Sequence, residues 1–561
     1  LTYQYDVSDP GSPVIKYVRL DGQEIYSYVY DRQARPGFSL LEAVSEGGTE
    51  YSTYSYHPDG RLAIASLSGG LSGHSFEYGI NETEVTGPLG EVQTFRWEMF
   101  GGSPRLLEVV SDAGACSSCA GLTRNLRYDA NGRVAGKTDF RGIEVSQELN
   151  ERGLAEVVHE VANSPCPSTF PNCELSSRVI LQSWDPNFPM LTERTVTGHA
   201  SAVPEQRTSA KITSTGQVEA YCTVAASMVG VSSYECGSSL DAPAGVRQIS
   251  SVYCSSSHSA LGVQSCPLAG LLIQLDGPRT DVSDITRYSY YLESDETGCE
   301  ADGPCHRRGD LQKVTDALGH EIWHVRYDGA GRVVRIRDAN GVLTDFAYHP
   351  RGWLTQRIVR FRPDGLPDAG DAITSIAHTV SGLVERMTSP DGDFIQYTYD
   401  DAQRLEGMSD ALGNYIVFTL DAAGNRVEEE TFDPSGTLRR RLAREYSALS
   451  RLVAERDAII EPANPSGRLV AEHGYDGNGN RTHTIDGHGH RSDYEYDPLN
   501  RLKRTLDAMV PRGITEFDYD ARDNLVSVTD PNGLVTEYVY DGLGDLRELR
   551  SPDTGTTTYL Y

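Results

Sequence analysis

The sequence predicts an all-β fold, built as an array of antiparallel β-hairpins that stack side by side. Three observations lead to this prediction: a Tyr-Asp motif recurs at a nearly constant interval, turn signals containing Gly separate the motifs, and side chains between the turns alternate in character. A repeat of roughly 20 residues or more is typical of arrays whose units are too small to form a core alone. We therefore expect the unit of stability to be the whole stack.

The Tyr-Asp motif continues into a turn and then into Arg-Leu or Arg-Val, as in Tyr-Asp-Gly-Ala-Gly-Arg-Val from Tyr327. The step is 21 residues from Tyr327 to Tyr348 and from Tyr519 to Tyr540, and longer steps are interpreted as loop insertions. The residues that define the repeat are Tyr327 and Asp328, Tyr399 and Asp400, Tyr475 and Asp476, Tyr496 and Asp497, Tyr519 and Asp520, and Tyr540 and Asp541.

A second turn signal lies between successive motifs, for example Asp-Ala-Leu-Gly at 316–319 and Asp-Pro-Asn-Gly at 530–533. Asp at the first position accepts hydrogen bonds from backbone N–H groups of the turn, and Gly at the fourth tolerates the left-handed backbone that lets a strand resume. Two turns in each repeat leave two short strands.

Residues between the turns alternate with period two, which indicates strands. One such stretch places Val342, Thr344, Phe346 and Tyr348 on one face and Leu343, Asp345 and Ala347 on the other. The 31 Tyr residues, against 13 Phe and 4 Trp, fit a sheet in which aromatic rings pack while their hydroxyls find polar partners. A single hairpin of this size is marginally stable in water, so the hairpins are expected to stack laterally.

These motifs resemble the YD repeats of the RHS family, which includes bacterial polymorphic toxins, the shell components of insecticidal Tc toxin complexes and the animal teneurins. The resemblance is dense over 310–561 and looser over 1–155. It implies a long sheet that spirals into a cocoon-like or barrel-like shell, which in bacterial members encloses a toxin polypeptide until delivery. Bacterial members usually end in an Asp-Pro-x-Gly segment that cleaves itself to release the C-terminal cargo. This sequence has no such ending: Asp-Pro-Asn-Gly at 530–533 is one of the repeat turns, and the chain stops at Tyr561, where the next Tyr-Asp motif should begin. We therefore expect both ends to be internal to something longer and the chain not to be an enzyme.

Three regions are expected along the chain. Residues 1–155 form a divergent YD-repeat region, 156–310 a disulfide-rich region of divergent repeats or an insert, and 311–561 a regular YD-repeat region. In the middle region the Tyr-Asp motif is lost while Ser and Cys become frequent. Divergent repeats within one continuous sheet are favoured over a separate inserted domain.

The charge balance excludes some partners. There are 80 acidic and 50 basic residues, giving a formal net charge of -30. Nucleic acid is not expected as a partner, because phosphate binding needs concentrated Lys and Arg. No run of apolar residues is long enough for a membrane span. The expected partners are a toxin or cargo polypeptide from the protein's own C-terminal region, or other copies of the chain, with a cell-surface glycan as a further candidate.

All ten cysteines lie in or near the middle region and form five close pairs in the sequence. An even number in short steps predicts disulfides formed in an oxidising compartment, which favours a secreted, extracellular or cell-surface protein. The rival interpretation of the first pair, as a zinc or redox Cys-x-x-Cys motif, lacks a second pair nearby. The predicted pairs are Cys116 and Cys119, Cys166 and Cys173, Cys222 and Cys236, Cys254 and Cys266, and Cys299 and Cys305.

No catalytic, cofactor-binding or metal-binding residues are expected, and no cofactor. The strongest metal candidate is the group of His483, His488 and His490, since imidazoles at such spacing can hold zinc. Plain turn residues are favoured, because 530–533 fills the same turn position without any His.

The function expected from these observations and from the family resemblance is a non-catalytic structural shell that encapsulates and delivers a C-terminal toxin or cargo polypeptide. The alternative is an extracellular adhesive or fibrous surface protein that binds glycans or assembles with copies of itself. A carbohydrate-active enzyme is the third and least favoured hypothesis, because no acid pair among the 80 carboxylates is framed by a recognisable pocket signature.

Overall fold

A computed structural model describes residues 2–6, 14–20, 23–31, 39–112, 122–160, 177–198, 206–225, 231–239, 242–254, 266–299, 303–457 and 467–560. The fold is all β, as predicted: the described residues form 43 strands in one antiparallel sheet, and the 3-10 turn η1 (Ser68–Gly70) is the one helical segment among them. Each strand pairs with the next along the chain, from β1 with β2 to β42 with β43. The sheet is therefore a continuous meander.

The first part of the meander contains fourteen strands. They are β1 (Thr2–Asp6), β2 (Val14–Leu20), β3 (Gln23–Asp31), β4 (Leu40–Glu46), β5 (Thr49–Tyr56), β6 (Leu62–Leu67), β7 (His74–Tyr78), β8 (Glu82–Thr86), β9 (Val92–Phe100), β10 (Ser103–Asp112), β11 (Leu122–Tyr128), β12 (Val134–Thr138), β13 (Glu144–Leu149) and β14 (Ala155–Glu160).

The middle region continues the same sheet, and β14 pairs with β15 just as β21 pairs with β22. Its strands are β15 (Arg178–Trp184), β16 (Leu191–Gly198), β17 (Gln206–Ile212), β18 (Val218–Val224), β19 (Val246–Tyr253), β20 (Leu272–Asp276) and β21 (Thr286–Tyr290).

The regular repeats supply the remaining strands. They are β22 (Leu311–Thr315), β23 (Glu321–Tyr327), β24 (Val333–Arg337), β25 (Leu343–Tyr348), β26 (Leu354–Val359), β27 (Ala372–His378), β28 (Val384–Thr388), β29 (Phe394–Tyr399), β30 (Leu405–Asp410), β31 (Tyr415–Leu420), β32 (Arg426–Phe432), β33 (Leu438–Tyr446), β34 (Leu452–Asp457), β35 (Arg468–Tyr475), β36 (Arg481–Asp486), β37 (Arg491–Tyr496), β38 (Leu502–Leu506), β39 (Ile514–Tyr519), β40 (Leu525–Thr529), β41 (Val535–Tyr540), β42 (Leu546–Ser551) and β43 (Gly555–Thr558).

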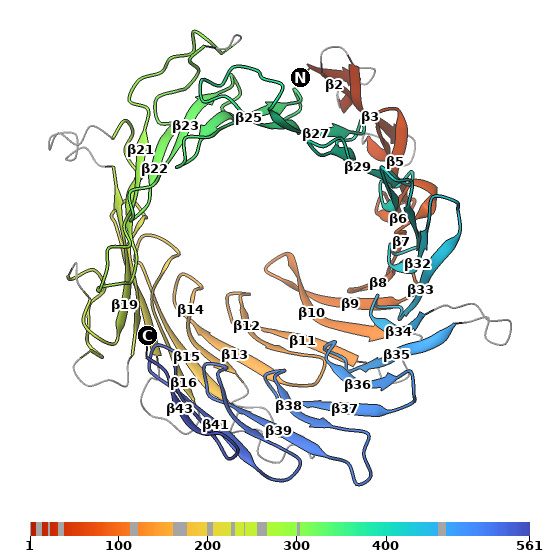
Figure 1. Ribbon diagram of the computed structural model, residues 1–561. Coiled ribbons are helices and arrows are strands. Elements are labelled where there is room, and N and C mark those ends of the chain that lie inside the picture. The colour runs from red at the N-terminus through yellow and green to blue at the C-terminus, as the bar shows by residue number, and fades with distance from the viewer. Residues whose placement is uncertain are drawn as a thin grey trace.

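The sheet curls into a spiral of more than one full turn (Figure 1). Strands from β2 to β25 run once around the ring, and the strands from β27 onward lie beside the N-terminal ones as they begin a second turn (Figure 1). The sheet does not close on itself, because among the described residues β1 pairs with β2 and β43 with β42, and the two end strands do not pair with each other. The spiral sheet predicted for the family is therefore present, with open ends.

Regular hairpin turns explain why the strands are so short and even. In the turn after β40, the Gly533 N–H donates to the Asp530 carbonyl at 2.9 Å, and the Asp530 N–H donates to the Leu534 carbonyl at 2.9 Å. Gly533 has a φ of +81°. This is a type I turn closed by a left-handed residue, one of the common hairpin connections. The predicted Asp-x-x-Gly turns are of this kind.

The wall is one sheet thick in the described residues, because the extensive contacts between strands are those between neighbours in the meander. Few apolar side chains are therefore fully buried. The main buried cluster lies in the middle region and contains Cys222, Val224, Val231 and Val246. Among the described residues no helix has the length and apolar character needed to cross a bilayer.

Candidate functional site

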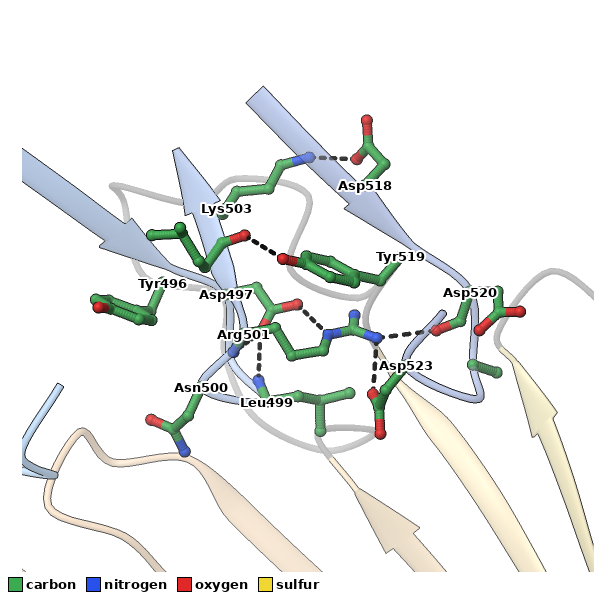
Figure 2. Close-up of polar contacts among 12 residues, drawn as sticks. Tyr496, Asp497, Leu499, Asn500, Arg501, Lys503, Asp518, Tyr519, Asp520 and Asp523 are labelled. Atoms are coloured by element: carbon green, nitrogen blue, oxygen red, sulfur yellow. Dashed lines mark hydrogen bonds and ion pairs between the residues drawn. The ribbon is translucent and has the colours of Figure 1, made fainter. Parts of the chain in front are cut away.

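The Tyr-Asp motif forms a repeating polar network that joins each motif to the next one along the sheet. We call this set the motif network: the Tyr, Asp, Arg and Leu (or Val) of one motif with the Tyr and Asp of the following motif. Figure 2 shows the network that joins the motif at 496–502 to the motif at 519–520. It contains the charged groups most characteristic of the repeat, so it is the first candidate for a functional site.

Asp497 holds its own turn and its own arginine. Its Oδ1 accepts the N–H groups of Leu499 and Arg501, both at 2.9 Å, and its Oδ2 accepts the Arg501 Nε–H at 2.7 Å (Figure 2). The Asp497 residue is only 4% exposed. Both carboxylate oxygens are thus occupied by donors from within the motif.

Arg501 connects its motif to the next one. One of its terminal nitrogens donates to the Asp520 carbonyl at 2.9 Å and to the Asp523 carboxylate at 3.0 Å, and the guanidinium lies 4.9 Å from the centroid of the Tyr519 ring (Figure 2). Such a cation–π contact adds to the ion pairs when it is shielded from water. Arg332 and Arg404 make the corresponding contacts to the carbonyls of His349 and Asp421.

The motif tyrosine completes the network in the opposite direction. The Tyr519 hydroxyl donates to the carbonyl of Leu502, the last residue of the preceding motif, at 2.9 Å. Burial raises the pKa of Tyr519, so the hydroxyl keeps its proton for this bond at neutral pH. The same bond to the first or second residue of the preceding strand recurs around the sheet: Tyr56 to Leu41, Tyr290 to Leu272, Tyr327 to Leu311, Tyr348 to Val333, Tyr399 to Val384 and Tyr475 to Leu452.

The other predicted motif residues occupy equivalent places. Tyr327, Tyr399, Tyr475, Tyr496, Tyr519 and Tyr540 each end a strand, and each following Asp accepts backbone N–H groups of its turn. Burial alone would raise the pKa of Asp328, but hydrogen bonds from the Arg332 side chain and backbone outweigh it and lower that pKa below its ordinary value. The Asp328 carboxylate is therefore held ionised by its own turn.

A second set of contacts joins the two turns of the spiral, and we call it the seam. Loops that follow odd-numbered strands carry the Tyr-Asp motif and form the motif rim of the sheet, and loops that follow even-numbered strands form the opposite rim. At the seam, the opposite rim of the first turn meets the motif rim of the second turn. The hydrogen-bonded partners across it are separated by 298 to 359 residues in the sequence.

Arginines supply many of the seam contacts. Arg141, at the tip of the loop after β12, donates to the Asp497 carbonyl at 3.0 Å, the Tyr496 carbonyl at 3.1 Å and the Asn500 side chain at 2.9 Å. Arg178 likewise reaches the Ala521 carbonyl and the Asp523 carboxylate. The seam thus attaches directly to the motif networks of the second turn.

Three motif turns lack the usual Gly and use its replacement at the seam. Gln403, Asn500 and Asp523 adopt φ values of +62°, +62° and +70°, a backbone region that L residues other than Gly visit at a cost of about 1 kcal/mol or more. Each side chain contacts the first turn of the spiral: Gln403 donates to Glu46 at 3.0 Å, Asn500 accepts from Arg141, and Asp523 accepts from Arg178. At these three positions the residue that replaces Gly contributes a contact across the seam, whereas Ser450, at the equivalent place after Tyr446, contacts Asn425.

Glu46 is a buried acid of the seam. It is 8% exposed and lies 3.3 Å from the Arg351 guanidinium and 3.0 Å from the Gln403 amide. Tyr26 has a raised pKa, first because of burial and then because of Glu46 beside it. Breaking one partner of such a pair leaves a buried charge unpaired, which is costly.

The structure joins three of the five predicted cysteine pairs as disulfides. They are Cys222–Cys236, Cys254–Cys266 and Cys299–Cys305. Cys222, Cys254 and Cys305 are buried, at 0%, 4% and 1% exposure. The pairs Cys116 with Cys119 and Cys166 with Cys173 lie outside the described residues.

In the structure, Asp486 takes the place of His483 beside His488 and His490. His488 and His490 lie together with Asp486, and potential ligand atoms of the three residues are within 4.8 Å of one another. The side chain of His483 instead lies over Gly474, where an added Cβ would be 2.1 Å from the imidazole. Backbone N–H groups of His490 and His488 lower the pKa of Asp486 to about 2.

A comparison with family models finds the RHS repeat at residues 306–342, 327–365 and 519–559. These matches coincide with motif networks that the structure describes, so the chain contains RHS repeats in these stretches. No sequence match to a curated protein was found.

A comparison with solved structures matches Tc toxin components at TM-scores below 0.5. The Tc holotoxin pore of Photorhabdus luminescens matches at 11% identity over 98% of this chain and 30% of the solved chain, with a TM-score of 0.35. TcdB2-TccC3 without its hypervariable C-terminal region matches at 12% identity over 97% and 32% of the two chains, with a TM-score of 0.38. The chain thus spans about a third of the length of these solved chains.

Proposed function

We propose that this chain is part of the wall of a hollow shell that encloses and delivers a polypeptide cargo. The observation that carries the proposal is the spiral: motif networks join the hairpins into one sheet, and the seam joins successive turns of that sheet into a wall (Figure 1). A long, thin wall of this kind surrounds a volume without filling it. The RHS repeats support the same function, because shells of this family enclose toxin polypeptides.

The wall itself is proposed to be non-catalytic. In the motif network the Asp497 oxygens accept turn N–H groups and Arg501, and the Tyr519 hydroxyl donates to a backbone carbonyl. Groups held in this way lack the free proton-transfer capacity that general acids and bases need. A panel of glycan and peptide substrates tests this directly, and turnover that survives removal of contaminating enzymes would contradict it.

The shell is proposed to work outside the cell or at its surface. The three described disulfides support this, because disulfides persist in oxidising compartments. An adhesive surface protein is the second candidate, and exposed apolar side chains on the opposite rim favour it. Leu318, Leu412 and Met509 are 83%, 76% and 68% exposed at loops that follow even-numbered strands. Self-association or glycan binding by the purified protein, without any enclosed polypeptide, would support that candidate.

Protease protection of a co-purifying cargo separates the two functions. The complete product of the gene is purified with any polypeptide that it retains, and exposed to a broad-specificity protease in wild-type form and as the seam variant Arg141→Ala. The shell function predicts that the retained polypeptide resists cleavage in the wild type and is cut in the variant. Equal cleavage in both, or no retained polypeptide, would overturn it.

A further inference from the structure

The loop between β36 and β37 presents three potential metal ligands to solvent. Asp486, His488 and His490 have ligand atoms within 4.8 Å of one another. The His490 and Asp486 side chains are 67% and 47% exposed. The loop follows an even-numbered strand, so it lies on the opposite rim, while the second turn uses its motif rim at the seam. The group is therefore reachable from solution.

The chain contains a second turn with nearly the same geometry but without the middle histidine. At 316–320, Asp316 Oδ1 accepts the N–H groups of Leu318 and His320 at 2.9 and 2.8 Å, and its Oδ2 lies 2.9 Å from His320 Nδ1. At 486–490 the corresponding distances are 2.8, 2.9 and 3.0 Å. The turn forms equally well with Leu318 at the middle position, so its geometry does not require His488.

We propose that Asp486, His488 and His490 form a binding site for Zn²⁺ or a divalent ion of similar ligand preference. Zinc in proteins binds imidazole nitrogen and carboxylate oxygen at about 2.0–2.2 Å, which places neighbouring ligand atoms of a tetrahedron about 3.3 Å apart. The Asp486 Oδ2 and His490 Nδ1 atoms, 3.0 Å apart, are already close to that separation. Rotation of the exposed His488 side chain brings the third ligand into range.

The turn and the metal use different oxygens of Asp486. Its Oδ1 accepts the two backbone N–H groups that hold the turn, and its Oδ2 faces the His490 ring. Metal binding through Oδ2 therefore leaves the hairpin intact. Three protein ligands leave one position of the tetrahedron for water or for a donor from another molecule, as in open zinc sites.

A reciprocal exchange between the two turns tests the proposal. Zn²⁺ is titrated into the full, disulfide-oxidised chain in competition with a chromogenic chelator, for the wild type, for His488→Leu and for Leu318→His. The first variant copies the natural turn at 316–320, and the second builds the three-ligand group there. Circular dichroism verifies that both variants keep the wild-type strand content. Co²⁺ replaces Zn²⁺ in a parallel titration, because its visible absorption reports tetrahedral coordination.

The site predicts that His488→Leu binds one Zn²⁺ ion fewer than the wild type and that Leu318→His binds one more. The tetrahedral Co²⁺ bands should fall in the first variant and rise in the second. Equal stoichiometry in the wild type and His488→Leu would overturn the proposal. So would a Leu318→His chain that gains no ion, since it would show that this geometry does not suffice for binding.

Discussion

Replacing Asp497 with Ala should open its motif network far more than the same change at an ordinary turn. Asp497 accepts two backbone N–H groups and the Arg501 guanidinium, and the Asp497 and Arg501 side chains are 6% and 13% exposed. Removing one partner of a buried ion pair costs about 3–5 kcal/mol. Arg501 keeps its contacts to Asp523 and the Asp520 carbonyl, so we expect a value near the lower end, about 3 kcal/mol.

Asp338→Ala is the matched control. Asp338 accepts the N–H groups of Asn340 and Val342 at 2.9 and 2.8 Å, the same two bonds as in the Asp497 turn, but the structure shows no hydrogen bond from an arginine side chain to it among the described residues. Its loss should cost about 1 kcal/mol. The difference, about 2 kcal/mol, corresponds to a roughly 30-fold larger local opening equilibrium at Asp497.

Hydrogen exchange measured by mass spectrometry is the suitable assay, because a repeat array of this length need not unfold in a single step. Exchange should accelerate in peptides that cover 497–525 in Asp497→Ala, and only slightly in peptides around 338 in the control. Equal acceleration at the two turns would show that the arginine contact contributes nothing and would refute the motif network as a source of stability.

Three further outcomes are expected. Arg141→Ala should destabilise the seam by about 2 kcal/mol or more and raise hydrogen exchange at both 139–142 and 496–500. The control Arg127→Ala removes an exposed ion pair with Glu144 and should cost less than about 1 kcal/mol. Equal effects of the two substitutions would contradict the seam. Thermal stability should fall as the pH is lowered from about 4 to about 2. Turn carboxylates such as Asp486 have a folded pKa of about 2, below their ordinary value, so their contribution to stability is present above about pH 4 and is lost as they are protonated. A melting temperature that stays constant over this interval would contradict this prediction. Reduction should expose 206–254 to protease before 311–457, since Cys222–Cys236 fixes the buried cluster of the middle region; earlier cleavage in 311–457 would rule this out.

Local features of the fold could be predicted from the sequence because their causes are local. Period-two alternation and Asp-x-x-Gly turns determine hairpins within about 20 residues, so the strand after the 338–341 turn ends at Tyr348 as the motif spacing indicates. The spacing of Cys222 and Cys236 likewise reflects one loop closed by a disulfide.

The seam could not be predicted in this way, because its partners are brought together by the curvature of the entire sheet. Arg141 and Asn500 are 359 residues apart, and no local period encodes that distance. One signal was available: Gln403, Asn500 and Asp523 stand where the motif otherwise has Gly, and each contacts the other turn of the spiral. For the histidine group, the sequence indicated His488 and His490 but named His483 as the third member, where the structure has Asp486. The period-two rule used for strands does not hold within a turn.

Electron cryomicroscopy of the purified chain tests most directly whether motif networks and the seam build one spiral wall. We expect a curved wall one sheet thick, with the loops around Arg141 in density continuous with the turn that contains Asn500. A flat sheet, a solid rod, or a spiral whose successive turns do not touch would contradict it.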